Sequence, residues 1–337
     1  MHFIDSSYEI IEQAPGLIGV YKQIEKAART AYKSEDKIAE GSAQRMVESL
    51  CKLNHGAALE HGTIYLEVPY NTKRDCLING YSIYSADHVI PRIDAQYASN
   101  PYSKVHLNPE KQVAAITTNA RVIFEHGWQD DLQYMCEPTK FHEKRITVKF
   151  ITSIGIVREI LRHRHFSFLN ESTRYCNYGK DKFGSELTFI IPRWIYDLQA
   201  EEASYPDPCD RSSRAWLMDE HGEDLIKDLI CMDRTASSWW DAMTRAEEDY
   251  MYFISTDEGY KLKPEEARGI LPLDLKSELI VTGFVSDWIH FFRLRSHIAA
   301  TGKPHPDIQK LADPLMQEFI DRGYCTYEEI HKEQVPS

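Results

Sequence analysis

Residues 158–178 read REILRHRHFSFLNESTRYCNY, and this stretch decides how the rest of the chain is interpreted. It gathers four arginines and two histidines: Arg158, Arg162, His163, Arg164, His165 and Arg174. The chain as a whole is acidic, with a formal net charge of -13. Two like charges ~4 Å apart repel by about 4 kcal/mol at an effective dielectric constant of ~20. The cluster therefore indicates either a solvated basic face or a site that binds an anion.

Three details favour a binding site. A helix is predicted over residues 154–164, and on it Arg164 falls on the apolar side. Glu159 lies one turn before Arg162 and His163, where it can orient either side chain. The segment SFLNESTRY then combines hydroxyl, amide, carboxylate and guanidinium groups. Such a set can hold a phosphate together with a hydrogen-bonding base.

A second candidate feature lies near the far end, in LKSELIVTGFVSDWIHFFRLRSH. A helix is predicted over residues 275–296, and on it an aromatic stripe ends in Arg295. The Arg295 guanidinium either reaches outward to solvent or points into a pocket. Arg268, in EARGILP, precedes another apolar run.

The chain is long enough for a large core, with 337 residues of which 42% are hydrophobic. Its periodicities predict two helices in 17–53, strands at 63–70 and 145–153, and helices at 111–128 and 235–255. Strands and helices do not alternate as in a βαβ protein, so we expect an α+β fold. We interpret residues 1–337 as one domain with insertions at 71–144 and 196–224.

Several classes of protein and site are disfavoured. The acidic charge argues against general nucleic-acid binding, which needs a basic face. The seven cysteines form no CxxC pair. Isolated cysteines such as Cys176 are more often inert core residues than nucleophiles. A metal site is disfavoured because no further His or acidic residue follows His163 and His165 at the spacing of metal ligands. With no signal-peptide pattern and no apolar run of ~18 residues, we expect a cytoplasmic protein without a membrane span.

The basic stretch also resembles a known family. Arg162-His163-Arg164, seven residues and then Ser172 match the pattern of flavin-dependent thymidylate synthases, as does the Arg174-Tyr175 that follows. Three further blocks resemble that family in the same order along the chain: AARTAYKS (27–34), NHGAALEHGTIYLEV (54–68) and EARGILPLDLKSELIVTGFVSDWIHFFRLR (266–295). These four blocks hold about a fifth of the 337 residues and are spread along the chain from residue 27 to residue 295.

The resemblance implies the family's α+β fold, with an antiparallel or mixed sheet flanked by long helices. It also implies reductive methylation of dUMP to dTMP. Methylenetetrahydrofolate would supply the carbon and NADPH the hydride, through FAD, without a cysteine nucleophile. The protein would be a homotetramer whose active sites combine residues from several subunits. The absence of the GxGxxG and GxxxxGK[ST] motifs agrees with a flavin held by side chains.

The resemblance assigns two sets of residues. FAD would be bound by His55, Glu60, Arg162, His163, Arg164, Asn170 and His290. The substrate dUMP would be bound by Glu159, Arg162, Asn170, Glu171, Ser172, Arg174, Arg268 and Arg295. Of these, Arg268 and Arg295 would reach in from another subunit. Either Asn170 or Glu171 would make the contact usually made by one family glutamate. Arg295 would be catalytic, because it stabilises negative charge that develops on the uracil ring.

Two alternatives remain at this point. One is a non-catalytic module that keeps the basic site to bind a nucleotide or an RNA loop. The other is a metal-dependent nucleotide hydrolase that uses His163 and His165. Bound flavin would separate the first from the thymidylate synthase, and resistance to a chelator would exclude the second.

Overall fold

The computed structural model describes residues 1–70, 75–78, 81–84, 92–179, 186–202, 233–255, 261–300 and 302–331. For residues 75–78, 81–84 and 199–202 the description is confined to the backbone. Helices and strands both contribute to the fold, as the sequence predicts.

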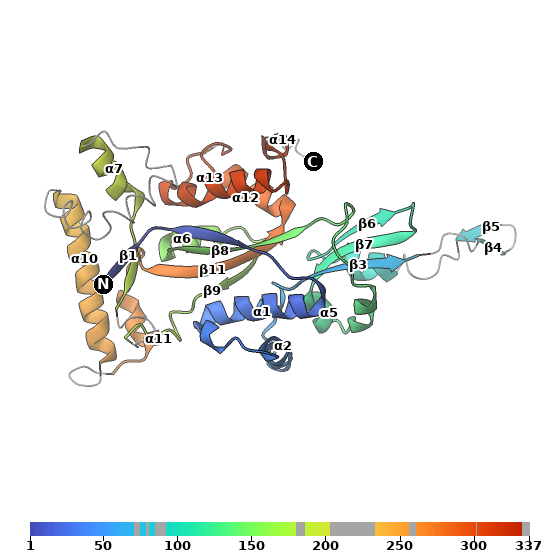
Figure 1. The fold of residues 1–337 in the computed structure, drawn as a ribbon, viewed down its shortest axis with the longest axis horizontal. Helices are drawn as coiled ribbons and strands as arrows, with labels where there is room; N and C mark the ends of the chain where they lie inside the picture. The colour runs from blue at the N-terminus through green and yellow to red at the C-terminus, as the bar shows by residue number, and fades with distance from the viewer. Residues whose placement is uncertain are drawn as a thin grey trace.

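A four-stranded antiparallel sheet forms the centre of the molecule (Figure 1). Its strands, in spatial order, are β2 (Ser7–Ile11), β8 (Arg145–Ser153), β11 (Lys276–Phe284) and β9 (Ser167–Asn170). The inner pair, β8 and β11, is in register along nine residues, from Lys276 opposite Ser153 to Phe284 opposite Arg145. All but the first residue of β11 are buried, which explains its nearly continuous apolar sequence.

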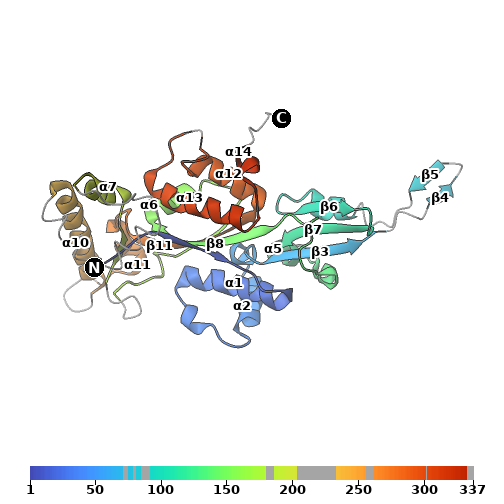
Figure 2. The same cartoon turned by 45° about the horizontal axis from the view of Figure 1, so that its top comes forward.

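Helices cover both faces of this sheet (Figures 1 and 2). On one face lie α1 (Gly16–Tyr32) and α2 (Ser42–Lys52), and on the other lie α12 (Val285–Arg295) and α13 (Pro306–Asp321). Trp288 of α12 is fully buried, packs against Phe166 and Phe319, and donates from Nε1 to the Ile146 carbonyl at 3.1 Å. The aromatic stripe therefore forms the main core.

A second sheet has the order β3 (Thr63–Pro69), β7 (Val113–Asn119), β6 (Lys104–Asn108). Its apolar face shares a core with α1, α2 and α5 (Ala120–Glu125). Two of its three strands come from the segment 71–144, whose status as an insertion stays a prediction. The structure shows that residues 104–119 of this segment form two strands that pair with β3 in a packed sheet.

The remaining elements are shorter or lie at the edges. They are β1 (His2–Ile4), α3 (Gly56–Leu59), β4 (Asp75–Ile78), β5 (Tyr81–Tyr84), a π-helix (Asp94–Ala98), α6 (Ile154–Ile160), β10 (Thr188–Ile190), α7 (Arg193–Glu202), α10 (Arg234–Ile254), α11 (Pro264–Ala267), α14 (Tyr327–His331), and 3-10 turns at Glu35–Lys37, Gln129–Tyr134 and Arg268–Ile270. Strand β1 pairs in parallel with β10.

The predicted helices in 17–53 and at 235–255 and the strands at 63–70 and 145–153 are confirmed. The helix predicted over 275–296 is wrong in its first half, which is β11, and the helix over 111–128 is wrong where β7 lies. Both errors have one cause, since a short buried strand has no alternation to distinguish it from a buried helix. The predicted excursion 196–224 begins in α7, and its residues 203–224 lie outside the described part of the chain.

No helix within the described ranges is both long enough and apolar enough to cross a membrane.

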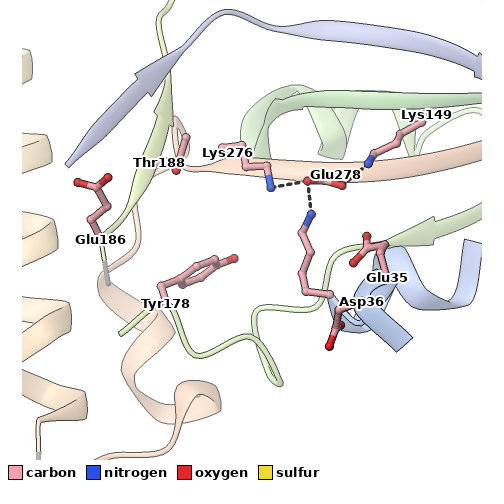
Figure 3. Close-up of a pocket in the computed structure, with 9 residues that line it drawn as sticks. Glu35, Asp36, Lys149, Tyr178, Glu186, Thr188, Lys276 and Glu278 are labelled. Atoms are coloured by element: carbon pink, nitrogen blue, oxygen red, sulfur yellow. Dashed lines mark hydrogen bonds and ion pairs between the residues drawn. The ribbon is translucent and has the colours of Figure 1, made fainter. Parts of the chain in front are cut away.

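A cluster of charged side chains ties the end of α1 to the central sheet (Figure 3). Glu278 of β11 lies at its centre, with its carboxylate 2.7 Å from Lys276 Nζ and 2.6 Å from Lys149 Nζ. Lys33, the first residue after α1, also pairs with Glu278. The three lysines and Glu278 line a cavity of about 660 Å³. Several partners are needed here because a buried charge without one is strongly destabilising.

Glu171, directly after β9, joins this charged cluster with a fully buried side chain. Its Oε2 accepts from Lys276 Nζ at 3.1 Å and its Oε1 from the Tyr178 hydroxyl at 3.0 Å. Its backbone N donates to the Glu278 carbonyl at 2.8 Å. The cluster therefore joins α1, β8, β11 and the chain that follows β9.

Acid should weaken the fold through Glu278. Burial raises the pKa of Glu278, but the neighbouring lysines lower it further, to about 2, from an ordinary value of 4.5. A depressed pKa gives stability that is complete above pH 4.5 and is lost as pH falls toward 2. We expect Glu278→Gln to unfold at lower urea than wild type near neutral pH, and the difference to shrink between pH 4.5 and 2.

Glu12→Gln is the matched control, because Glu12 pairs with Arg322 while 73% of its side chain is exposed. A stability difference between Glu278→Gln and wild type that stays constant down to pH 2 would show that this charge does not stabilise the fold.

Candidate active site

A basic cavity of about 580 Å³ lies between the turn after α6 and one face of α12. Residues 162–166 line it on one side. The α12 side chains that line it are Ser286, Asp287, His290, Leu294 and Arg295. Lys104 of β6 completes the lining. The cavity thus joins three segments that are far apart in the sequence.

The turn after α6 buries some of its side chains and exposes others. Helix α6 ends at Ile160, where the His163 N–H closes a turn onto the Ile160 carbonyl at 3.1 Å. His163 and Phe166 are buried, whereas Arg162 and Arg164 are exposed. The prediction that Arg164 lies on the apolar side of a helix over 154–164 was wrong, because the helix stops four residues before it. Arg164 lines the basic cavity instead.

Arg295, at the end of α12, connects the two walls of the cavity. Its Nε donates to His163 Nε2 at 3.0 Å, its Nη1 to Glu159 Oε2 at 2.6 Å, and its Nη2 to the Glu159 carbonyl at 3.2 Å. The planar fork of the guanidinium makes these three contacts at once. The sequence-based alternative that Arg295 points into a pocket is therefore confirmed.

His163 is neutral in this arrangement. Burial lowers its pKa to about 4, and the nearby Arg295 and His290 lower it in the same direction. Since Nε2 accepts from Arg295, the single ring proton is on Nδ1. His163 therefore orients Arg295 without adding a charge.

The cavity has an excess of positive charge. Four permanent cations line it, Lys104, Arg162, Arg164 and Arg295, against one carboxylate, Asp287. Arg295 pairs with Glu159, but within the described part of the chain neither Lys104, Arg162 nor Arg164 forms an ion pair. Cations gathered without counter-ions form a site for an anionic ligand such as a phosphate.

Three of the residues assigned to dUMP lie elsewhere, on the loop after β9 and beside α11. Arg174 Nη2 contacts Glu265 Oε2 at 3.4 Å, and Arg268 Nη1 donates to Thr173 Oγ1 at 3.3 Å. Both arginines are exposed. Ser172 holds the loop in place, since its N–H donates to the Ala31 carbonyl at 3.0 Å. Ser172, Arg174 and Arg268 form a second group, here called the loop group, on this single chain.

Asn170 and Glu171 have partners on β11 and in the charged cluster. Asn170 Oδ1 accepts from Ser277 Oγ at 2.9 Å, and Glu171 is held by Lys276 and Tyr178. Neither residue lines the basic cavity. Their assignment to dUMP and FAD stays a prediction.

His55 and Glu60 lie at the two ends of the short helix α3. His55 is exposed, and Glu60 pairs with Arg121 at 2.5 Å. The Glu60 carbonyl also accepts from Arg145 Nη1 at 2.9 Å. Neither side chain lines the basic cavity, and their assignment to FAD stays a prediction.

The sequence analysis did not identify Lys104 or Asp287 as site residues. Lys104 lies in β6, far from every quoted block, so no local pattern marks it. Asp287 had a signal, because it lies three residues after the N-cap Phe284 and accepts from its N–H at 3.0 Å. Mistaking β11 for helix hid this helix start.

The metal-hydrolase alternative gains no support from the structure. Among the residues whose side chains are described, no group of three His, Cys, Asp or Glu side chains is placed to hold a metal ion. His163 already uses Nε2 to accept from Arg295.

Comparisons with known proteins show which family and which individual proteins this chain is similar to. Residues 94–322 match the family described as thymidylate synthase complementing protein. A probable flavin-dependent thymidylate synthase of Mycobacterium phage D29 is 26% identical over 185 residues, 54% of this chain and 62% of that protein. Another, of Paramecium bursaria Chlorella virus 1, is 28% identical over 185 residues, 53% of this chain and 68% of that protein.

Two further proteins are similar to this chain. The flavin-dependent thymidylate synthase of Synechocystis is 26% identical over 175 residues, 52% of this chain and 67% of that protein. A crystal structure of PolB, a UMP/dUMP methylase of Streptomyces cacaoi, is 17% identical and covers 95% of this chain and 93% of its own, with a TM-score of 0.39. At that TM-score, the structural similarity supports no conclusion about fold or function.

The match to the family extends from before β6 to the end of α13 and includes every segment that lines the basic cavity. Because it covers more than half of the 337 residues, the chain belongs to the thymidylate synthase complementing protein family.

Proposed function

We propose that the protein is an FAD-dependent thymidylate synthase that methylates dUMP reductively to dTMP. Methylenetetrahydrofolate would be the carbon donor and NADPH the reductant, in the cytoplasm. The observation that carries this proposal is the basic cavity, whose unpaired cations fit a phosphorylated ligand, in a chain of this family. No thiol takes part, and the buried Cys176 agrees with that.

The residues of the basic cavity fit a flavin dinucleotide. Arg162 and Arg164 offer guanidinium groups that have no ion-pair partner in the part of the chain that the structure describes, and guanidinium groups suit diphosphate oxygens. His163 and His290 line the same cavity with their rings 6.3 Å apart. The cavity also has the size expected of a cofactor site. When bound, FAD would supply the hydride, taken from NADPH, that reduces the one-carbon unit transferred from methylenetetrahydrofolate to the methyl group of dTMP.

The dUMP site would need a second chain. Arg295 and Glu159 lie at the basic cavity, whereas the loop group lies beside α11. In Figure 1, α11 lies near the N-terminus and α10, away from α12. The resemblance implied that Arg268 and Arg295 come from the same subunit, but Arg268 lies in the loop group with Arg174. We therefore propose a homotetramer in which Arg174 and Arg268 of one subunit and Arg295 of another meet at one nucleotide. Arg295 would then stabilise negative charge on the uracil ring.

The alternative function is a nucleotide- or RNA-binding module without catalysis. The same unpaired cations would serve it. It does not explain why Arg295 is fixed by three contacts to His163 and Glu159, because a module that only binds phosphate needs charge rather than fixed direction.

The decisive experiment combines an absorbance spectrum of the purified protein with deuterium tracing from NADPH into dTMP. The purified protein should show the absorbance of bound oxidised flavin. With dUMP, methylenetetrahydrofolate and deuterium-labelled NADPH, it should form dTMP that contains deuterium from the reductant. A colourless protein that binds dUMP but forms no dTMP, even after FAD is added, would favour the binding module.

Arg295→Lys should lower kcat at least tenfold, about 1.4 kcal/mol in activation free energy. An ammonium group cannot reach His163 Nε2, the Glu159 carboxylate and the Glu159 carbonyl together, so the charge loses its fixed position. Steady-state dTMP formation gives the measurement. Arg322→Lys, at a surface pair with Glu12, should keep wild-type kcat. Full turnover by Arg295→Lys would exclude Arg295 from catalysis.

Arg174→Ala should weaken dUMP binding by about 1.5–3 kcal/mol, the strength of a hydrogen bond to a charged group. The protein should keep its stability, because the pair of Arg174 with Glu265 is exposed. Calorimetric titration with dUMP measures the effect, and Arg322→Ala provides a control at another exposed arginine. Unchanged dUMP affinity in Arg174→Ala would show that this side chain does not contact the nucleotide.

A further inference from the structure

The basic cavity has a neighbour, a smaller cavity of about 160 Å³. Four side chains line both cavities: Lys104, Arg164, His165 and Asp287. Two of these are permanent cations, and neither forms an ion pair within the described part of the chain. The two cavities are therefore adjacent, and the boundary formed by these four shared side chains is here called the passage.

Lys104 reaches this passage from outside the basic stretch. It is the first residue of β6, in the three-stranded sheet, and it is exposed. Its Nζ lies 5.5 Å from the centre of the Phe284 ring, whose side chain is buried at the start of α12. A cation over an aromatic face is attracted by the ring, so the ammonium group has a preferred position at the cavity.

Arg145 adds a fixed positive charge on the same side. It lines the smaller cavity, is 9% exposed, and its Cζ lies 5.6 Å from the centre of the Phe284 ring. Among the described residues its Nη atoms donate to neutral acceptors only, the Glu60 carbonyl, Thr63 Oγ1 and Ser167 Oγ. Its Nε has no hydrogen-bond partner among the described residues. A buried guanidinium without a carboxylate partner makes the small cavity favourable for an anion.

One carboxylate opposes this positive charge. Asp287 lines both cavities, but it already accepts from the Phe284 N–H. Burial raises the pKa of Asp287, whereas the Phe284 N–H and the nearby His165 and Lys104 act to lower it. Lys104, Arg145 and Arg164 therefore outnumber the one acid around the passage.

We propose that Lys104 is a phosphate-binding residue of this site and contacts the phosphate groups of the flavin nucleotide at the passage between the two cavities. This inference rests on the proposed function. It gives the segment 71–144 a role, since β6 would carry a cation from the second sheet to a ligand held mainly by the turn after α6 and by α12. A lysine ammonium suits this task because it binds phosphate as a point charge without requiring a planar geometry.

The test compares three flavins that differ in their phosphates. Apoprotein is titrated with FAD, FMN and riboflavin, with flavin fluorescence as the signal. Lys104→Gln keeps the length of the side chain and removes its charge. We expect it to weaken FAD binding by about tenfold and to leave riboflavin binding unchanged. The FAD affinity of the variant should also depend less on salt than that of wild type, because one charge contact is lost.

The chain offers a closely matched control. Lys140 is also exposed, and its Nζ lies 5.1 Å from the centre of the Phe141 ring, but it lines neither cavity. Lys140→Gln should bind all three flavins as wild type does. Thermal unfolding of both variants should match wild type, because both lysines are at the surface.

Each contrary result has a distinct meaning. If Lys104→Gln binds FAD with wild-type affinity and salt dependence while wild type is an active flavoprotein, Lys104 is not a contact and the proposed function stands. If riboflavin binding falls as much as FAD binding, the contact is not to phosphate and the inference is wrong. If wild type binds no flavin at all, the proposed function fails and this inference fails with it.

Discussion

The pairing of β8 with β11 is the constraint on which the rest of the molecule depends. Their nine-residue antiparallel register buries both strands at the centre of the fold. Because they run in opposite directions, α6 leaves one end of the pair and α12 leaves the other. Both helices pack on the same core, around Ile156, Ile160 and Trp288. The turn after α6 and one face of α12 consequently meet, and the basic cavity lies between them.

Two clusters of charge in this acidic chain differ in how they are compensated. Around Glu278, three lysines and two glutamates form ion pairs with one another inside the protein, so each charge has a partner. At the basic cavity, Arg162 and Arg164 have no such partners within the described residues. Uncompensated charge in a cavity costs stability, and ligand binding is the usual reason for it. The presence or absence of ion-pair partners therefore distinguishes the structural cluster around Glu278 from the proposed binding site at the basic cavity.

Much of the site could be predicted because its chemistry is concentrated locally. The arginines and histidines of 162–165 are adjacent in the sequence, and Arg295 ends an aromatic stripe that is in fact buried. The errors arose where burial removes periodicity. Residues 276–284 and 113–119 are buried on both faces, so their apolar runs resembled helices. The position of Arg164 was predicted wrongly because RHRH contains no helix-ending residue, such as Gly or Pro, to indicate that α6 ends at Ile160.

The sequence by itself determined the residue types of the site, their order along the chain and the resemblance to a family, because these depend only on local spacing. The tertiary structure alone decided which of these residues meet. It brought Arg295 onto His163 and Glu159, moved Glu171 into the charged cluster, and carried Lys104 from a different sheet to the cavity. Contacts between residues more than a hundred positions apart follow from strand register and helix packing, which no local pattern encodes.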